Sequence, residues 1–334
     1  TLDIGGTNVT STATELNLLD GKDATHLAVP GKLEGTNFTG SLLIGHATTG
    51  TLSSSENNTG VGVGALDALS SGDRNTAIGH DAGTAVTTAN NSTLLGFEAG
   101  KGITGANMNV AIGDSALAGS NTDSNSASNT VVGAFAMNVS SGAKENTAIG
   151  RDAGREVTTG DGNIFIGYNA GANDNTSGIT TGSGNVIIGT VDPDSRTGDR
   201  QLKIAGNDGS TTTTWISGDN SGNLTFAANA TVTGDLTVNG TTTTVNSTTV
   251  TIDDPIFTLG GDTAPGSDDN KDRGIEFRYH NGSAAKVGFF GFDDSASKFT
   301  FIADASNSSE VFSGSAGDVA FGEVVATSLD ISGN

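Results

Sequence analysis

N-T-A-I-G at residues 75–79 decides the fold, because close variants of this five-residue phrase recur along the chain. The phrase occurs nine times between Ser41 and Thr190. Its final glycine lies at positions 45, 62, 79, 96, 113, 133, 150, 167 and 189. Most steps between these glycines are 17 residues, and the two longer intervals are 20 and 22 residues. Such a fixed period predicts a stack of similar coils, each of which buries its apolar face against its neighbours.

Two sets of aliphatic residues predict how each coil is built. A branched aliphatic residue precedes every repeat glycine, and an alanine follows three positions after it in seven coils. A second aliphatic residue comes seven positions after the glycine at Leu52, Leu69, Val86, Ile103, Val157 and, after allowance for an insertion, Ile179. We therefore expect two short strands in each coil. The extra residues of the longer coils fall in 120–128 and 173–178, which are rich in turn formers, so strand register should survive them.

The first predicted strand has apolar residues on both faces. The position two before the glycine is apolar in most coils, as in Leu94, Val131 and Phe165, and the next position is always aliphatic. Both faces of such a strand need to be shielded from water. One face can line the coil interior, and the other is expected to be buried against a partner. We therefore expect a homo-oligomer with the repeat region at its centre.

These phrases also carry a resemblance. The segments beginning at Asn75, Asn146 and Asn163 resemble the head repeats of trimeric autotransporter adhesins, in which three chains pack as a left-handed β-roll, although that repeat is shorter. The order of segments, including T-A-T-E-L-N-L-L-D-G at 12–21 and D-L-T-V-N-G at 235–240, resembles tail-fibre and other virion fibre proteins of marine cyanophages. This resemblance implies an intertwined homotrimer on a phage particle, with other virion or tail proteins and host surface polysaccharide as partners.

Composition limits the possible classes of protein. The 334 residues include 50 glycines, 5% aromatic residues and 16% charged residues, which argues against one large globular core. The formal net charge of -22 excludes nucleic-acid binding and favours solubility of a long fibre over a cation-dependent contact. The chain has no cysteine and no run of 18 apolar residues, so we expect neither disulfides nor membrane insertion. Similar phrases at residues 1–7 and 328–334 suggest an internal piece of a longer fibre.

The pattern changes along the chain predict five segments. They are a shaft strand, a capped helical turn at 12–21 and a connector (1–40), the β-roll (41–190), a turn-rich linker followed by a Thr-rich β shaft (191–252), a Phe-rich antiparallel β domain (253–326), and the start of a further shaft segment (327–334). Nine of the 14 phenylalanines lie in the fourth segment, and Asn281-Gly282 in it is a strong hairpin signal.

Candidate chemistry is sparse. The histidines His26, His46, His80 and His280 are far apart, and His46 and His80 occupy a variable position predicted to be an outer surface, so we expect no metal site. The pairs Asp253-Asp254, Asp268-Asp269 and Asp293-Asp294 are compatible with Ca²⁺ or with glycosidase carboxylates, but each sits among turn residues. The aromatic residues Tyr168, Trp215 and Tyr279 are scattered. The phosphate-loop-like G-V-G-V-G at 60–64 lacks a following lysine, and the coil period explains it.

The sequence thus predicts an all-β, trimeric fibre segment of a bacteriophage virion that supports host attachment. It predicts no enzyme activity, catalytic residue, cofactor or metal, and it identifies no receptor-binding residue. One alternative is an adhesin whose own surface binds a cell-surface glycan. The other is a tailspike-like polysaccharide depolymerase.

Overall fold

The computed structural model describes residues 31–46, 48–119, 128–172, 177–239 and 265–320, two short strands before residue 9, and short stretches between 245 and 260 and at 322 and 325. All regular secondary structure in these residues is β-strand, which confirms the predicted all-β class. The described part of the chain contains no helix with the length and apolarity needed to cross a membrane.

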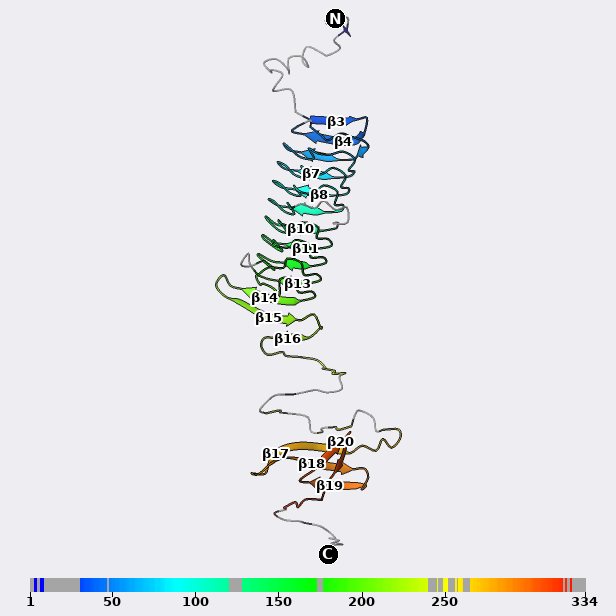
Figure 1. The fold of residues 1–334 in the computed structure, drawn as a ribbon, viewed down its shortest axis with the longest axis vertical. Helices are drawn as coiled ribbons and strands as arrows, with labels where there is room; N and C mark the ends of the chain where they lie inside the picture. Colours follow the sequence, from blue (N-terminus) through cyan, green and yellow to red (C-terminus); the bar gives the residue numbers. More distant parts are fainter. Residues whose placement is uncertain are drawn as a thin grey trace. The chain divides into compact units, whose positions relative to one another are not determined.

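A β-solenoid of about nine turns fills most of residues 31–226 (Figure 1). Each coil adds one strand to a single sheet, and neighbouring coils pair in parallel in the order of the chain. The strands of the stack are β4 (Phe38–Ile44), β6 (Thr59–Val61), β7 (Thr76–Ile78), β8 (Thr93–Leu95), β9 (Val110–Ile112), β10 (Thr130–Val132), β11 (Thr147–Ile149), β12 (Ile164–Ile166), β13 (Val186–Ile188) and β14 (Leu202–Asn207). At the first end β3 (Gly31–Gly35) lies antiparallel to β4, and β5 (Ser55–Glu56) also pairs with β4.

The two longer coils keep the strand register, as predicted. Val110 of β9 lies opposite Thr130 of β10 across the 20-residue step, and Ile164 of β12 lies opposite Val186 of β13 across the 22-residue step. The additional residues therefore lie outside the paired strands, where they disturb no ladder hydrogen bond.

Apart from the first coil, which also contains β5, each 17-residue coil contains one strand, so the prediction of two in every coil is wrong. The second aliphatic residue is buried in a turn, because residues two and four positions after the repeat glycine are left-handed. After Gly79, Asp81 has φ 55° and Gly83 has φ 59°. Extended strand needs negative φ, so the chain turns tightly and the Val86 amide donates to Gly83 within the coil. Neighbouring coils still bond there, since the Gly83 amide donates to Ala99.

The core is a narrow column of alanine and aliphatic side chains inside the coils. Its largest members are accommodated by glycines in adjacent turns. A Cβ atom on Gly83 or on Gly100 would lie 2.6 Å from a methyl carbon of Leu94, and Phe165 is flanked by two glycines in the same way. Side-chain volume is thus balanced between neighbouring coils, as close packing requires.

The repeat glycine itself is fixed by backbone geometry. Gly79 has φ 138°, and a Cβ atom there would lie 2.2 Å from the carbonyl oxygen of Gly96 in the next coil. All nine repeat glycines have positive φ. A side chain at this position would therefore be strained and would also press the coils apart.

The first residue of the phrase forms a buried hydrogen-bond ladder. The backbone amide and Nδ2 of Asn146 both donate to Oδ1 of Asn129, each at 3.1 Å, and Nδ2 also donates to the carbonyl of Gly160 at 3.0 Å. Oδ1 of Asn146 in turn accepts from the backbone amide and Nδ2 of Asn163. The column comprises Asn58, Asn75, Ser92, Asn109, Asn129, Asn146, Asn163, Asn185 and Gln201, all buried. The ladder thus satisfies buried backbone groups and joins one coil to the next.

Residues 191–200 complete a further coil, although the sequence predicted a linker there. Gln201 takes the asparagine position and donates from Nε2 to Oδ1 of Asn185 at 3.1 Å. Strand β14 then pairs in parallel with β13, with Ile204 opposite Ile188. The prediction of a linker is wrong because the period here is one residue short and the phrase lacks its asparagine.

Strands expected to form a separate shaft instead close the solenoid sheet. β15 (Thr212–Gly218) pairs antiparallel with β14, and β16 (Leu224–Phe226) pairs antiparallel with β15. Lys203 stands opposite the core residue Ile187 and pairs with Asp194 at 2.7 Å. In β14 a charged side chain therefore replaces the aliphatic residue at this position, and its ammonium group reaches an exposed carboxylate.

The Phe-rich region contains the predicted antiparallel meander of β17 (Arg273–His280), β18 (Ala285–Asp293) and β19 (Lys298–Ile302). A hairpin of β20 (Ser306–Ser308) and β21 (Val311–Ser313) packs on it, because buried Phe289 stacks on Phe312 with ring centroids 4.1 Å apart. The chain divides into two compact units between Leu236 and Thr237.

Near the start of the chain, β1 (Asp3–Ile4) and β2 (Thr7–Asn8) form a small antiparallel pair. Several other expectations concern residues outside the described ranges. The capped turn at 12–21, the acidic pair Asp253-Asp254 and the last segment, 327–334, all lie outside the described residues.

Candidate functional site

The outer face of the solenoid sheet is the most extended candidate site. In the three-residue strands β7 to β13 the middle side chain is buried and the flanking side chains point outward, so Ala111 is fully buried while Ile112 is 36% exposed. Ile78, Ile149 and Ile166 are each about 40% exposed in the same column. We call the outward residues the outer seam. They are Thr59, Val61, Thr76, Ile78, Thr93, Leu95, Val110, Ile112, Thr130, Val132, Thr147, Ile149, Ile164, Ile166, Val186 and Ile188.

The seam continues past both ends of the repeat. Residue pairing places Leu42 and Ile44 of β4 beside Thr59 and Val61. At the other end it runs through Leu202 and Ile204 of β14, Ile216 and Gly218 of β15, and Leu224 and Phe226 of β16. Antiparallel strands β15 and β16 lie outside the periodic part, yet apart from Gly218 they keep aliphatic or aromatic residues in this column. Duplication of the repeat unit therefore does not by itself explain the apolar column.

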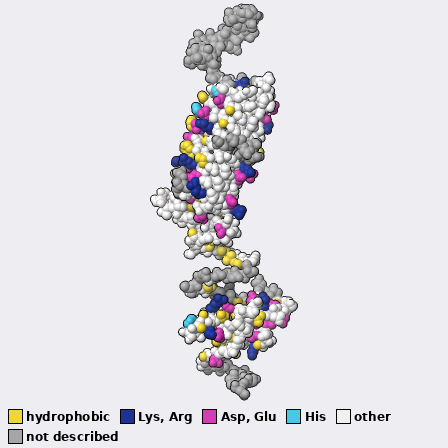
Figure 2. Space-filling model, viewed as in Figure 1, with side chains coloured by type: hydrophobic (Ala, Val, Ile, Leu, Met, Phe, Trp, Pro, Cys, Tyr) yellow, Lys and Arg dark blue, Asp and Glu magenta, His cyan; other side chains and the backbone are white. Residues whose placement is uncertain are grey.

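No seam residue from Leu42 to Phe226 is charged, although 16% of the chain is charged. The charged side chains of the solenoid lie elsewhere on its coils. In Figure 2 the solenoid face in view is mostly uncharged, with acidic and basic side chains scattered over it. A long uncharged strip that exposes isoleucine can be buried by another protein surface without desolvating ions.

A more variable column borders the seam at the residue that follows each repeat glycine. As predicted, this is an outer surface: Val63, Phe97 and Tyr168 are each about half exposed. The ring of His80 stacks on that of Phe97 with centroids 5.5 Å apart, and the Arg151 guanidinium lies 5.5 Å from the Tyr168 ring centre. This border therefore offers aromatic and cationic groups next to the apolar seam.

The described histidines have local partners. Nε2 of His46 hydrogen-bonds the carbonyl of Ala65 at 2.8 Å, and Nδ1 of His280 accepts from the Gly282 amide at 3.0 Å. Among the residues with described placement, no group of three or more His, Asp or Glu side chains is arranged to hold a metal ion. His26 lies outside them.

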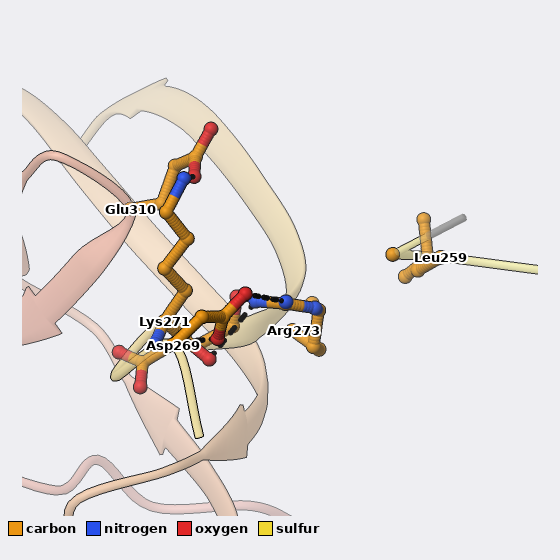
Figure 3. A pocket seen from close by; sticks show the side chains of 8 residues that line it. Leu259, Asp269, Lys271, Arg273 and Glu310 are labelled. Carbon is orange, nitrogen blue, oxygen red and sulfur yellow. Dashed lines mark hydrogen bonds and ion pairs between the residues drawn. The ribbon is translucent and has the colours of Figure 1, made fainter. Parts of the chain in front are cut away.

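A polar hollow of about 340 Å³ lies in the second unit (Figure 3). Arg273 pairs with Asp269 at 2.5 Å, and Lys271 pairs with Glu310. The hydrogen bond from Arg273 lowers the pKa of the Asp269 carboxyl. Leu259 stands apart from these ion-paired side chains in the close-up. The charges of the hollow are thus largely compensated by one another.

The structure brings two of the predicted acidic pairs together. Loss of hydration, together with the nearby carboxylates of Asp268, Asp269 and Asp272, raises the pKa of Asp294. The same pairs also make the turn hydrogen bonds expected of aspartate: Asp293 accepts from the Ala296 amide, and Asp268 accepts from the Asn270 amide. Turn formation therefore accounts for both pairs.

The other predicted features lie in separate environments. Trp215 is exposed on β15, and Tyr279 donates from its hydroxyl to the carbonyl of Ala303 at 2.7 Å. Gly60 and Gly62 of the G-V-G-V-G phrase belong to β6 and its repeat turn, so the coil period does account for this phrase.

No protein-family model matches this chain, and neither the curated proteins nor the solved structures compared with it yield a match. Sequence reasoning missed two features of the candidate region, the asparagine ladder and the extension of the seam into β14–β16. The recurring asparagine was visible in the phrase, whereas the extension depends on strand pairing that no repeat indicates.

Proposed function

We propose that this chain is a structural segment of a bacteriophage fibre, that it assembles as a homotrimer through the outer seam, and that it supports host attachment from the virion surface. The observation that carries the proposal is the seam from Leu42 to Phe226, which is uncharged and consists mainly of aliphatic and threonine side chains. Its role is mechanical: a stack of similar coils keeps its length because every coil is hydrogen-bonded to the next.

A second copy of the same chain suits the seam better than an unrelated partner does. Identical copies have the same spacing between coils, so their columns can remain in register over the whole stack. With a net charge of -22 per chain, copies repel at most surfaces and can approach best along a strip without charge. The expectation of three copies comes from the resemblance of the N-T-A-I-G phrases and the segment order to trimeric fibres.

The oligomeric mass of the purified chain, measured by light scattering, tests the assembly. We expect the mass of three chains. A well-folded monomer would refute burial of the seam between chains.

Antibodies against the purified chain test the virion role. We expect them to label appendages on cyanophage particles in electron micrographs. Labelling of bacterial cell surfaces in the absence of particles would instead support a cellular adhesin.

The border column favours a second candidate function, direct binding of a cell-surface glycan. Arg151 and Tyr168 form an exposed cation and ring pair of the kind that can contact a sugar face and an acidic substituent. Loss of cell binding by a Tyr168→Ala variant that still forms trimers would support this function. Unchanged binding would leave the segment with a supporting role only.

A further inference from the structure

The tip of the β17–β18 hairpin places a base on the backbone amide that follows an asparagine. His280 ends β17, Ala285 begins β18, and the two residues pair across the hairpin. The amide of Gly282 donates to Nδ1 of His280 at 3.0 Å. Because Nδ1 accepts this bond, the ring is in the tautomer that carries its proton on Nε2. A base at this distance is within reach of the amide proton.

The side-chain carbonyl of Asn281 is polarised by two other backbone amides. Its Oδ1 accepts from the backbone amides of Ser283 and Ala284 at 2.9 and 2.8 Å. Two amide donors at these distances stabilise negative charge that develops on a carbonyl oxygen under attack. Asn281 to Ala284 are all exposed, so water can enter and ammonia can leave. Gly282 has φ 92° and no side chain to shield its nitrogen.

We propose that Asn281 is a self-modification site, at which the protein converts its own asparagine into aspartate and isoaspartate. The Gly282 nitrogen attacks Cγ of Asn281 as His280 accepts the amide proton. The oxyanion forms on Oδ1 between the two amide donors. It collapses as Nδ2 takes the proton back from His280 and leaves as ammonia, which yields a five-membered succinimide. Water then opens this ring at either carbonyl, so the net change is amide plus water to carboxylate plus ammonium.

The reaction alters the hairpin. It adds a negative charge beside His280, and the isoaspartate form inserts one extra main-chain carbon into the turn. The pairing of His280 with Ala285 requires the original turn length, so we expect the tip of the hairpin to open after conversion.

The test follows conversion of Asn281 by peptide mass spectrometry after incubation in heavy-oxygen water at neutral pH. The folded protein and the urea-unfolded chain are compared. Asn239, which precedes Gly240 in the only other Asn-Gly pair of the sequence and follows a valine, is the internal reference. We expect folding to accelerate conversion at Asn281 by about tenfold or more, since a positioned base contributes about 10²–10⁴-fold in favourable cases.

Two substitutions separate catalysis from turn shape. His280→Gln keeps a hydrogen-bond acceptor without a comparable base, and His280→Val removes both. Each should reduce the folded rate at Asn281 to that of the unfolded chain while the rate at Asn239 stays the same. Amide exchange along β17 and β18 checks that the hairpin persists. Slower conversion in the folded than in the unfolded wild-type chain, or an unchanged folded rate in the His280→Gln variant with the hairpin intact, would overturn the proposal.

Discussion

At the scale of single residues, three positions of the repeat do different physical work. The asparagine satisfies buried backbone groups, the residue after the middle of the strand faces outward, and the glycine allows close approach of the next coil. The backbone amide and side chain of Asn146 make six hydrogen bonds at 2.8 to 3.1 Å. Because the groups concerned are buried, their loss costs more than the net value of an exposed hydrogen bond.

Asn146→Asp replaces the side-chain NH₂ group by an oxygen atom and keeps the size of the side chain. The Nδ2 donors to Asn129 and to the Gly160 carbonyl are replaced by a carboxylate oxygen that repels both acceptors. We expect a loss of about 3 kcal/mol or more in unfolding free energy at neutral pH, measured by urea unfolding. Burial raises the pKa of such a carboxyl, so the deficit relative to wild type should shrink as pH falls through that pKa. The exposed change Asn229→Asp should have little effect at any pH.

Alanine at two glycines compares left-handed strain alone with strain and steric clash together. Gly162 has φ 63°, and a Cβ atom there would have no neighbouring atom within 4 Å, whereas Gly96 has φ 138° and a Cβ atom there would lie 2.4 Å from the Gly113 carbonyl oxygen. Gly162→Ala should therefore cost about 1 kcal/mol, the usual cost of a left-handed conformation. Gly96→Ala should cost clearly more, and thermal unfolding of the two variants measures the difference. Equal losses of stability in the two variants would show that the coils move apart to accommodate the added methyl group without a further loss of stability.

At the scale of elements, the solenoid is a series of exchangeable coils. The parallel pairing of β6 with β7 and of β7 with β8 uses the same three positions of each strand. Interactions of a coil are mainly with its two neighbours, so stability should be close to the sum of each coil's own contribution and of its match to the adjacent coils.

Deletion of residues 76–92 tests this view. It joins Asn75 to Thr93 and recreates an intact N-T-L-L-G phrase, so Leu94 remains inside and Leu95 remains outside. We expect a folded, cooperatively unfolding protein with a smaller denaturant dependence, because less surface becomes exposed on unfolding. Deletion of residues 76–93 joins Asn75 to Leu94, which brings Leu94 to the outward position and Leu95 to the inward position before the glycine is reached, so the faces of the strand are exchanged. This variant should be strongly destabilised, and circular dichroism with urea titration compares the two.

The sequence predicted the coils well because two neighbouring positions recur in every coil for separate reasons. The branched aliphatic residue lies in the outer seam, and the glycine after it has positive φ. The sequence did not predict the single strand per coil, because Asp81 and Glu98 are left-handed through tertiary stacking and not through their own preference. It also missed the last coil, since Gln201 replaces the asparagine there. For the candidate site, the sequence showed that both faces of the strand were apolar, but only the fold shows that Ala77 points inward and Ile78 outward.

At the scale of the whole molecule, the proposed trimer requires that the seam be buried between chains. The core of a single chain does not involve the exposed side chain of Ile112 or Ile149. Assembly and folding of the coil can therefore be separated by substitutions that change the seam alone.

Ile112→Lys and Ile149→Lys each place an ammonium group in the proposed interface. We expect light scattering to show a mass of one chain for the double variant, while circular dichroism keeps the wild-type β signal. The charge has no partner on a surface without carboxylates, so its burial would cost several kcal/mol per chain. Thr88→Lys, at an exposed position outside the seam, serves as the control and should leave the oligomer unchanged. A double variant that remains trimeric would move the interface away from the seam.

Salt should strengthen the assembly if the seam holds it together. Three copies of a chain with a net charge of -22 repel one another, and added salt screens this repulsion over distances beyond about 10 Å at 0.1 M. The apolar contact itself gains or loses little at such concentrations, because the seam contains no ion to screen. The mass measured by light scattering at low protein concentration should therefore rise from one chain toward three as salt increases. An interface built from ion pairs, such as those around Arg273, would show the reverse, with dissociation as salt increases.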